Sequence, residues 1–93
     1  MPNPLHPGEF ISNVYLSPLG ISDTELAKNL NVDRSTVLQL LAKEIIVTPE
    51  MALRLSAVLG SSPGFWLTMQ SQYSLWQVEK EFDMSGLRQL LIS

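Results

Sequence analysis

Cysteine is absent from the 93 residues of this chain, which excludes a disulfide framework and a cysteine-based zinc site. A chain without cysteine fits the reducing cytoplasm, and we expect this one to be cytoplasmic. Histidine occurs once, as His6, and one histidine with a nearby carboxylate on Glu9 falls far short of a metal site. We therefore expect no metal site, and without a nucleophile–base pair we expect neither catalytic residues nor an enzyme.

Long apolar runs are also missing. No stretch approaches the length that spans a bilayer, and the start, MPNPLHPGEF, lacks a basic region followed by an apolar run. We expect neither export nor a membrane-bound form.

Positive charge is scarce: six lysines and arginines face nine acidic residues, giving a net charge of −3 and a pI near 4.9. This balance argues against a protein that binds nucleic acid mainly by neutralising phosphates. Any DNA binding must rest on local geometry and on two copies of the binding element. The acidic cluster of Glu79, Glu81 and Asp83 favours a basic protein partner, although such runs are usually solvated.

Apolar residues, in contrast, make up 45% of the chain and charged residues only 16%, which is typical of a globular protein. At this length we expect one domain, residues 1–93, whose small core a dimer would support.

Proline, glycine and capping residues divide the chain into five predicted helices. Ser22 with Glu25 matches a capping box, in which each side chain satisfies the other's backbone amide, and Asp33 is a suitable N-cap for the next helix. Thr48 and Ser62 each precede a proline at a first helical position. The predicted helices cover about 7–16, 23–30, 34–42, 49–59 and 63–81, with SPLG ending the first.

Helical spacing of apolar residues identifies the buried faces. In the first helix, Phe10 and Val14, with Ile11, lie on one face. No strand pattern competes, so the sequence predicts an all-α domain with a long C-terminal helix.

Residues 22–43 have the layout of a helix-turn-helix, two short helices joined by a tight turn, whose second helix enters the major groove of DNA. Ala27 is small where the helices cross, Asn31 tolerates the left-handed turn conformation, and Val37 packs back on the first helix. Helical hairpins without DNA partners could share this spacing. The remaining core residues are Leu26, Leu30, Val32 and Leu40.

Five segments carry a wider resemblance. They are HPGE at 6–9, PLGIS at 18–22, LAKNLNV at 26–32, TPEMALRL at 48–55 and GSSPGFWLTMQSQYSLW at 60–76. Together they resemble HigA-type antitoxins, a branch of the Xre-like, lambda-repressor-like helix-turn-helix regulators. The resemblance implies a homodimer that binds operator DNA to repress its own operon, and that neutralises a small basic toxin, a RelE/HigB-like ribonuclease. It implies no cofactor.

The chain departs from this family after the second helix of the pair, the predicted recognition helix. The family usually has a polar residue, glycine, lysine and arginine where this chain has AKEIIV, so Lys43 replaces a glycine that suits a left-handed turn. Leu38 and Gln39 occupy positions where the family often has serine and arginine. Glutamine favours adenine and brings no charge.

The predicted DNA contacts begin with the first turns and outer face of the recognition helix. These candidates are Arg34, Ser35, Thr36 and Gln39. In the alternative interpretation these residues contact no DNA: Ser35 and Thr36 only support the helix cap, and Arg34 and Gln39 are ordinary solvated residues.

Three further residues are candidates for contacts to phosphate. Ser22 and Thr24 lie at a helix N-terminus, whose free amides favour anions, although simple capping explains them equally well. Lys43 is either a phosphate contact or a surface lysine.

Aromatic residues line the predicted last helix at helical spacing. We expect Phe65 and Trp66 to cover the other helices, whereas Tyr73 and Trp76, at the far end, are candidates for a dimer or toxin interface. The tail from Met84 is apolar enough to dock on the body or on a second subunit, and both a short helix and a strand fit it.

The leading hypothesis is therefore a DNA-binding antitoxin. One alternative is a toxin-binding module in which DNA binding is weak or lost through the AKEII departure. Another is a stand-alone Xre-type regulator without a toxin.

Overall fold

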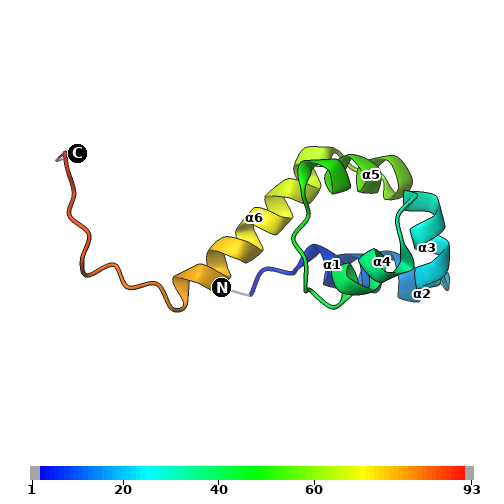
Figure 1. Cartoon of the computed structure of the whole chain (residues 1–93), viewed down its shortest axis with the longest axis horizontal. Helices are drawn as coiled ribbons and strands as arrows, with labels where there is room; N and C mark the ends of the chain where they lie inside the picture. The colour runs from blue at the N-terminus through cyan, green and yellow to red at the C-terminus, as the bar shows by residue number, and fades with distance from the viewer. Residues whose placement is uncertain (1–2, 92–93) are drawn as a thin grey trace.

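A computed structural model describes residues 3–91, which contain helices but no β-strand (Figure 1). The elements are α1 (Pro7–Ile11), the π-helical stretch η1 (Ser12–Leu16), α2 (Ser17–Leu19), α3 (Asp23–Leu30), α4 (Arg34–Leu41), α5 (Pro49–Leu59) and α6 (Pro63–Glu79). Since α1, η1 and α2 follow one another without a break, these residues form five helical units, and the all-α prediction is confirmed.

The first helical unit differs from its prediction. It continues through Pro18 and ends at Gly20, which adopts the left-handed conformation with φ of 66°. The wider π stretch ends at Leu16, two residues before Pro18, whose ring and missing N–H do not fit the interior of a regular α-helix. Buried positions are consequently five residues apart, Ile11 and Leu16, and the prediction that Val14 faces the core is wrong because Val14 is 44% exposed.

Side-chain caps start four of the helices within residues 3–91: His6 caps α1, and hydroxyl side chains cap three others. Ser22, Thr48 and Ser62 each accept a hydrogen bond from the backbone N–H three residues later, at 3.1, 3.2 and 3.1 Å. The predictions of these helix starts are confirmed. These bonds fix the first turns of α3, α5 and α6.

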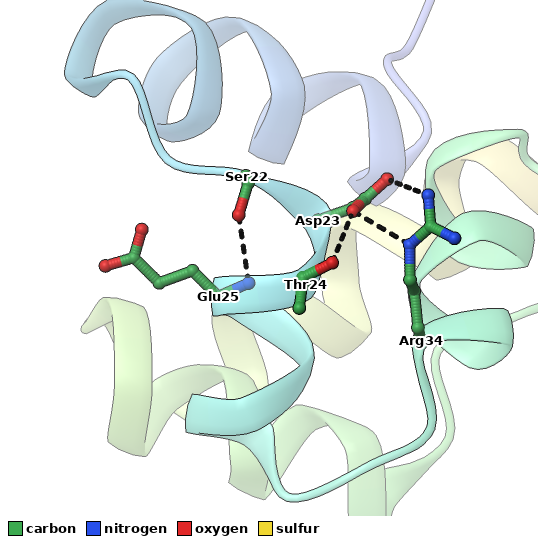
Figure 2. Close-up of polar contacts among 5 residues, drawn as sticks. All are labelled: Ser22, Asp23, Thr24, Glu25 and Arg34. Carbon is green, nitrogen blue, oxygen red and sulfur yellow. Dashed lines mark hydrogen bonds and ion pairs between the residues drawn. The ribbon is translucent and has the colours of Figure 1, made fainter.

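Two details of the predicted caps differ from the structure. The Glu25 carboxylate points away from Ser22, so only the serine half of the predicted capping box forms (Figure 2). Asp33 has the extended backbone of an N-cap, but its side chain accepts no capping bond. The Thr36 amide, which that side chain would have bonded, instead donates to the Asp33 carbonyl at 3.0 Å.

A single cluster of buried residues joins all five helical units. Trp66 of α6 is its largest member, with no exposed surface, and its ring N–H donates to the Gly60 carbonyl at 3.1 Å. Phe10, Tyr15 and Phe65 surround the Trp66 ring. The prediction that Trp66 belongs to the core is confirmed, while Phe65 lies at its edge.

Helix α1 crosses α4 closely at Gly8. A Cβ atom at this position would lie 2.0 Å from the Leu40 carbonyl oxygen, far inside contact distance. Only glycine allows this approach. The packing of α1 covers one face of α4 and leaves the opposite face of α4 toward solvent.

The far end of α6 projects away from the other helices, and the tail bends after it and runs still farther from them (Figure 1). Residues 82–91 form neither a helix nor a strand and are exposed, so both expected forms and the docking on this chain's own body are wrong for these residues. Docking on a second subunit stays a prediction, and residues 92 and 93 lie outside the described residues. The apolar side chains of the tail are more than half exposed, from 53% at Phe82 to 95% at Leu90. None of the helices within residues 3–91 has the length and apolar character needed to cross a bilayer.

Candidate nucleic-acid interface

Helices α3 and α4 form a tight pair that orients the outer face of α4. Ala27 and Val37 are 4% and 0% exposed where the helices meet, as the sequence predicts. Asn31 adopts the left-handed conformation with φ of 57°, and its N–H and that of Val32 donate to the Lys28 and Ala27 carbonyls, both at 3.1 Å. This pattern is the Schellman motif, which ends α3 and turns the chain into α4.

Arg54 of α5 stabilises this turn through hydrogen bonds to two of its backbone carbonyls. Its Nη1 donates to the carbonyls of Leu30 and Asn31 at 2.8 and 3.2 Å, and its Nη2 donates to Glu50 at 2.9 Å. The carbonyls at the end of α3 therefore have a charged donor from another helix. This role of Arg54 is not evident from the sequence, where the available signal is an arginine four residues after a glutamate on an otherwise apolar helix.

The predicted DNA-contacting side chains gather around the first turns of α3 and α4. Arg34, Ser35 and Gln39 are exposed on the outer face of α4, and Thr36 is half-buried. Leu38, which replaces the serine that the family often has, is also on this surface and is 41% exposed. The arrangement offers hydrogen-bond donors and acceptors together with an apolar side chain, which is what base edges in a major groove require.

At the start of α3, the exposed residues Ser22 and Thr24 have bonds within the protein. Ser22 caps the helix, and the Thr24 hydroxyl donates to Asp23 Oδ1 at 3.2 Å. The capping alternative therefore holds for Ser22, whereas Thr24 bonds to a neighbouring side chain and caps no amide. The remaining free amides of this turn still favour an anion.

Arg34 forms an ion pair with Asp23. Its Nε and Nη2 donate to Asp23 Oδ1 and Oδ2 at 3.1 and 3.3 Å, joining the first turn of α4 to that of α3 (Figure 2). These hydrogen bonds lower the pKa of the Asp23 carboxyl and raise that of the Arg34 guanidinium. Sequence reasoning missed Asp23, because nothing local connects two residues eleven positions apart.

Lys43 ends α4 in a left-handed turn with φ of 64°. The Lys43 and Glu44 amides donate to the Leu40 and Gln39 carbonyls at 3.1 and 2.9 Å, a second Schellman motif with lysine where glycine is usual. Lys43 Nζ lies 3.5 Å from Glu9 Oε1. The turn that the sequence predicts to be uncomfortable for lysine is therefore present.

The rest of the AKEIIV segment is tied to the body. Val47 is buried, and its N–H donates to Gln70 Oε1 of α6 at 2.9 Å. The Ile45 carbonyl lies 3.1 Å from His6 Nε2, while Ile46 is 63% exposed. In this chain the segment is thus a packed connection rather than a basic loop.

His6 organises the same region from the N-terminal side. Its buried ring accepts the Gly8 amide at Nδ1, at 2.9 Å, which caps α1 and leaves Nε2 to donate to the Ile45 carbonyl. The ring also meets Tyr73 edge to face, with centroids 4.9 Å apart. Burial lowers the pKa of His6, in agreement with the neutral form that these bonds require. Within residues 3–91, no group of three metal-ligating side chains occurs.

Tyr73 and Trp76 both lie half-buried near the projecting end of α6. Their rings are 5.8 Å apart, and Lys80 Nζ lies 3.6 Å above the Trp76 ring. Tyr73 therefore contacts the body through His6, and Trp76 lies further out on the helix.

The geometry of α3 and α4 agrees with a family comparison. The helix-turn-helix family model matches residues 15–66, from η1 into the first turn of α6. The chain belongs to this helix-turn-helix family. The matched region contains every predicted DNA-contacting residue.

Individual relatives identify the branch of the helix-turn-helix family. The uncharacterized HTH-type transcriptional regulator YddM of Escherichia coli is 42% identical, over 98% of this chain and 96% of its own. The solved structure of antitoxin GraA has a TM-score of 0.90 and 32% identity, covering 97% of this chain and all of its own. Antitoxin HigA of Pseudomonas aeruginosa, solved with the higBA promoter, has a TM-score of 0.73 and 33% identity, covering 86% of this chain and 96% of its own. This helix-turn-helix protein is HigA-like, as its sequence motifs indicate.

Proposed function

We propose that this chain is the antitoxin of a type II toxin–antitoxin pair. It is a cytoplasmic homodimer in which each subunit is one helix-turn-helix domain. The dimer represses its own operon and neutralises a small basic RelE/HigB-like ribonuclease. The observation that carries operator binding is the exposed face of α4, in a chain whose HigA relative is solved with its promoter.

In this proposal, α4 lies in the major groove. Arg34, Ser35 and Gln39 contact base edges, and the exposed Leu38 side chain suits a thymine methyl group. Thr36, which is half-buried, supports the first turn and reaches the backbone. Ser22, Thr24 and Lys43 are assigned to phosphates, the first two through the N-terminal amides of α3.

A specific observation favours a second candidate, a toxin-binding module with weak DNA affinity. Both basic side chains in residues 31–46 are paired with carboxylates, Arg34 with Asp23 and Lys43 with Glu9. These pairs reduce the charge available to phosphates, so operator binding must come from hydrogen-bond geometry repeated in two subunits.

Titration of the DNA upstream of the gene separates the two candidates. Binding to that fragment and to a random duplex of equal length is measured by fluorescence anisotropy over a salt series. We expect a preference for the upstream fragment, and we expect Arg34→Ala to lower it by roughly tenfold. Equal binding to both duplexes at every salt concentration would refute the repressor and leave the toxin-binding module.

The dimer contact is assigned to the projecting part of α6. Trp76 is half-buried there, and Leu75 and Val78 are 60% and 56% exposed, which is more apolar surface than a lone helix end usually shows. Tyr73 also packs on His6, so Trp76→Ala is the cleaner test. We expect a folded monomer by mass measurement in solution, whereas Leu19→Ala, at an exposed site on α2, keeps the dimer. An unchanged dimer in Trp76→Ala would assign this residue to another contact.

The toxin contact is assigned to the acidic end of α6 and the start of the tail. Glu79, Glu81 and Asp83 are all exposed, and together they suit a basic partner. The purified product of the adjacent gene is the probe. We expect the triple variant Glu79→Gln, Glu81→Gln and Asp83→Asn to bind this partner more weakly, with an affinity that depends less on salt concentration. Its affinity for the operator should be unchanged. If the adjacent gene encodes no basic partner, the stand-alone regulator is favoured.

A further inference from the structure

The Asp23–Arg34 pair joins the first residues of α3 and α4, where a helix-turn-helix protein approaches DNA. Both carboxylate oxygens accept bonds from the arginine, and Oδ1 also accepts the Thr24 hydroxyl (Figure 2). The Arg34 side chain is thus held at one edge by a residue from the other helix.

The pair leaves a defined part of the guanidinium free. Asp23 uses the edge formed by Nε and one side of Nη2, so the edge formed by Nη1 and the other side of Nη2 has no part in the ion pair. The Arg34 side chain is 60% exposed, whereas that of Asp23 is 27% exposed. The available edge is the two-donor fork that fits O6 and N7 of guanine.

The charge of the pair matters as much as its geometry. Beside Asp23, Arg34 contributes little net attraction for phosphate, since an adjacent carboxylate offsets its charge. Hydrogen bonding to a base edge depends on donor direction, and a guanidinium that is already oriented loses less side-chain freedom on binding.

We propose that Asp23 is a specificity-determining positioning residue. It holds Arg34 so that the Nη1–Nη2 edge contacts a guanine in the major groove, and it prevents Arg34 from serving as a phosphate contact. Asp23 itself touches no base. This inference rests on the proposed binding of operator DNA.

Asp23→Asn tests the inference, with Glu25→Gln as its matched control. Both changes remove one negative charge from the first turn of α3, but the Glu25 carboxylate points away from the pair (Figure 2). Affinities for the operator fragment and for a random duplex are measured at several salt concentrations. We expect Asp23→Asn to bind the random duplex more tightly and to reduce the operator-to-random ratio by roughly tenfold, the value of one bidentate base contact. Glu25→Gln should change both affinities alike and keep the ratio.

Substitution of 7-deazaguanine at each operator guanine adds a second readout, because it removes only the N7 acceptor. One position is expected to weaken binding of the wild-type protein and to have no effect on Asp23→Asn or Arg34→Ala. In the Arg34→Ala background, Asp23→Asn should no longer alter the operator-to-random ratio. This comparison within one background also separates positioning from any general loss of folding.

Each result distinguishes the two proposals. A wild-type preference for the operator, combined with an unchanged ratio in Asp23→Asn, would overturn the positioning role alone. The same conclusion follows if Asp23→Asn and Glu25→Gln behave alike, since Asp23 would then act only by repelling phosphate. A wild-type protein without any operator preference overturns both the repressor and the role of Asp23.

Discussion

Replacing Lys43 by glycine should stabilise the protein. Lys43 adopts φ of 64° at the end of α4, a conformation that costs a residue with a Cβ atom roughly 1–2 kcal/mol. The variant loses the ion pair with Glu9, but both side chains are more than a third exposed, so that contact contributes about 0.5 kcal/mol or less. Glycine also loses more chain entropy on folding. With about 0.5–1 kcal/mol for that entropy, we expect a net gain in the free energy of unfolding of about 0.5 kcal/mol, or roughly 2–4 °C in Tm.

Urea denaturation at a fixed protomer concentration measures this gain, because the stability of a dimer depends on concentration. Lys43→Ala is the control, since it removes the same ion pair and keeps the Cβ atom. Lys43→Asn should fall between the two because asparagine tolerates this backbone conformation. If Lys43→Gly is no more stable than Lys43→Ala, the backbone at residue 43 is not strained and the reasoning fails.

Three further substitutions test the contacts that hold the recognition helix. Gly8→Ala should destabilise the protein by about 2 kcal/mol or more, because its Cβ atom would lie 2.0 Å from a backbone oxygen of α4. Gly64→Ala is the control and should be tolerated, since its Cβ atom would have its nearest neighbour at 3.8 Å. The midpoints of urea denaturation compare the two variants. Arg54→Ala should lower the free energy of unfolding by about 1.5–3 kcal/mol and weaken operator binding, since it leaves the α3–α4 turn without its charged donor. An unchanged urea midpoint would mean that water replaces this donor. Burial lowers the pKa of His6, so the stability it contributes is complete above about pH 6.5 and is lost as pH falls toward the lowered folded value, by at most about 1.4 kcal/mol per pH unit. His6→Asn keeps an N-cap acceptor and should remove this loss of stability below pH 6.5, and an unchanged pH profile would contradict it.

The fold was largely predictable because its signals are local. Ser22, Thr48 and Ser62 bond to amides three residues away, and Asn31 occupies a left-handed turn, so short stretches of sequence determine where the helices begin and end. The exception is the first helical unit. Its π stretch shifts the buried face to Ile11 and Leu16, a change that α-helical spacing does not anticipate.

The candidate site was predictable only in outline. The exposed face of α4 follows from the periodicity that buries Val37 and Leu40, but the pairing of its residues does not. Asp23 holds Arg34 only because the α3–α4 turn brings two first turns together. The tail is a different case, since its apolar residues predict a contact that this chain's body does not supply.

The sequence by itself determined the five helices, the helix-turn-helix spacing and the outer face of α4, because capping, turn conformation and helical periodicity act over a few residues. Tertiary structure alone decided what orients that face. Gly8 meets α4 across thirty-two positions in the chain, Arg54 reaches the turn from α5, and Asp23 holds the arginine of α4. These contacts depend on how the helices cross, and the crossing is set by the packing of the whole core around Trp66.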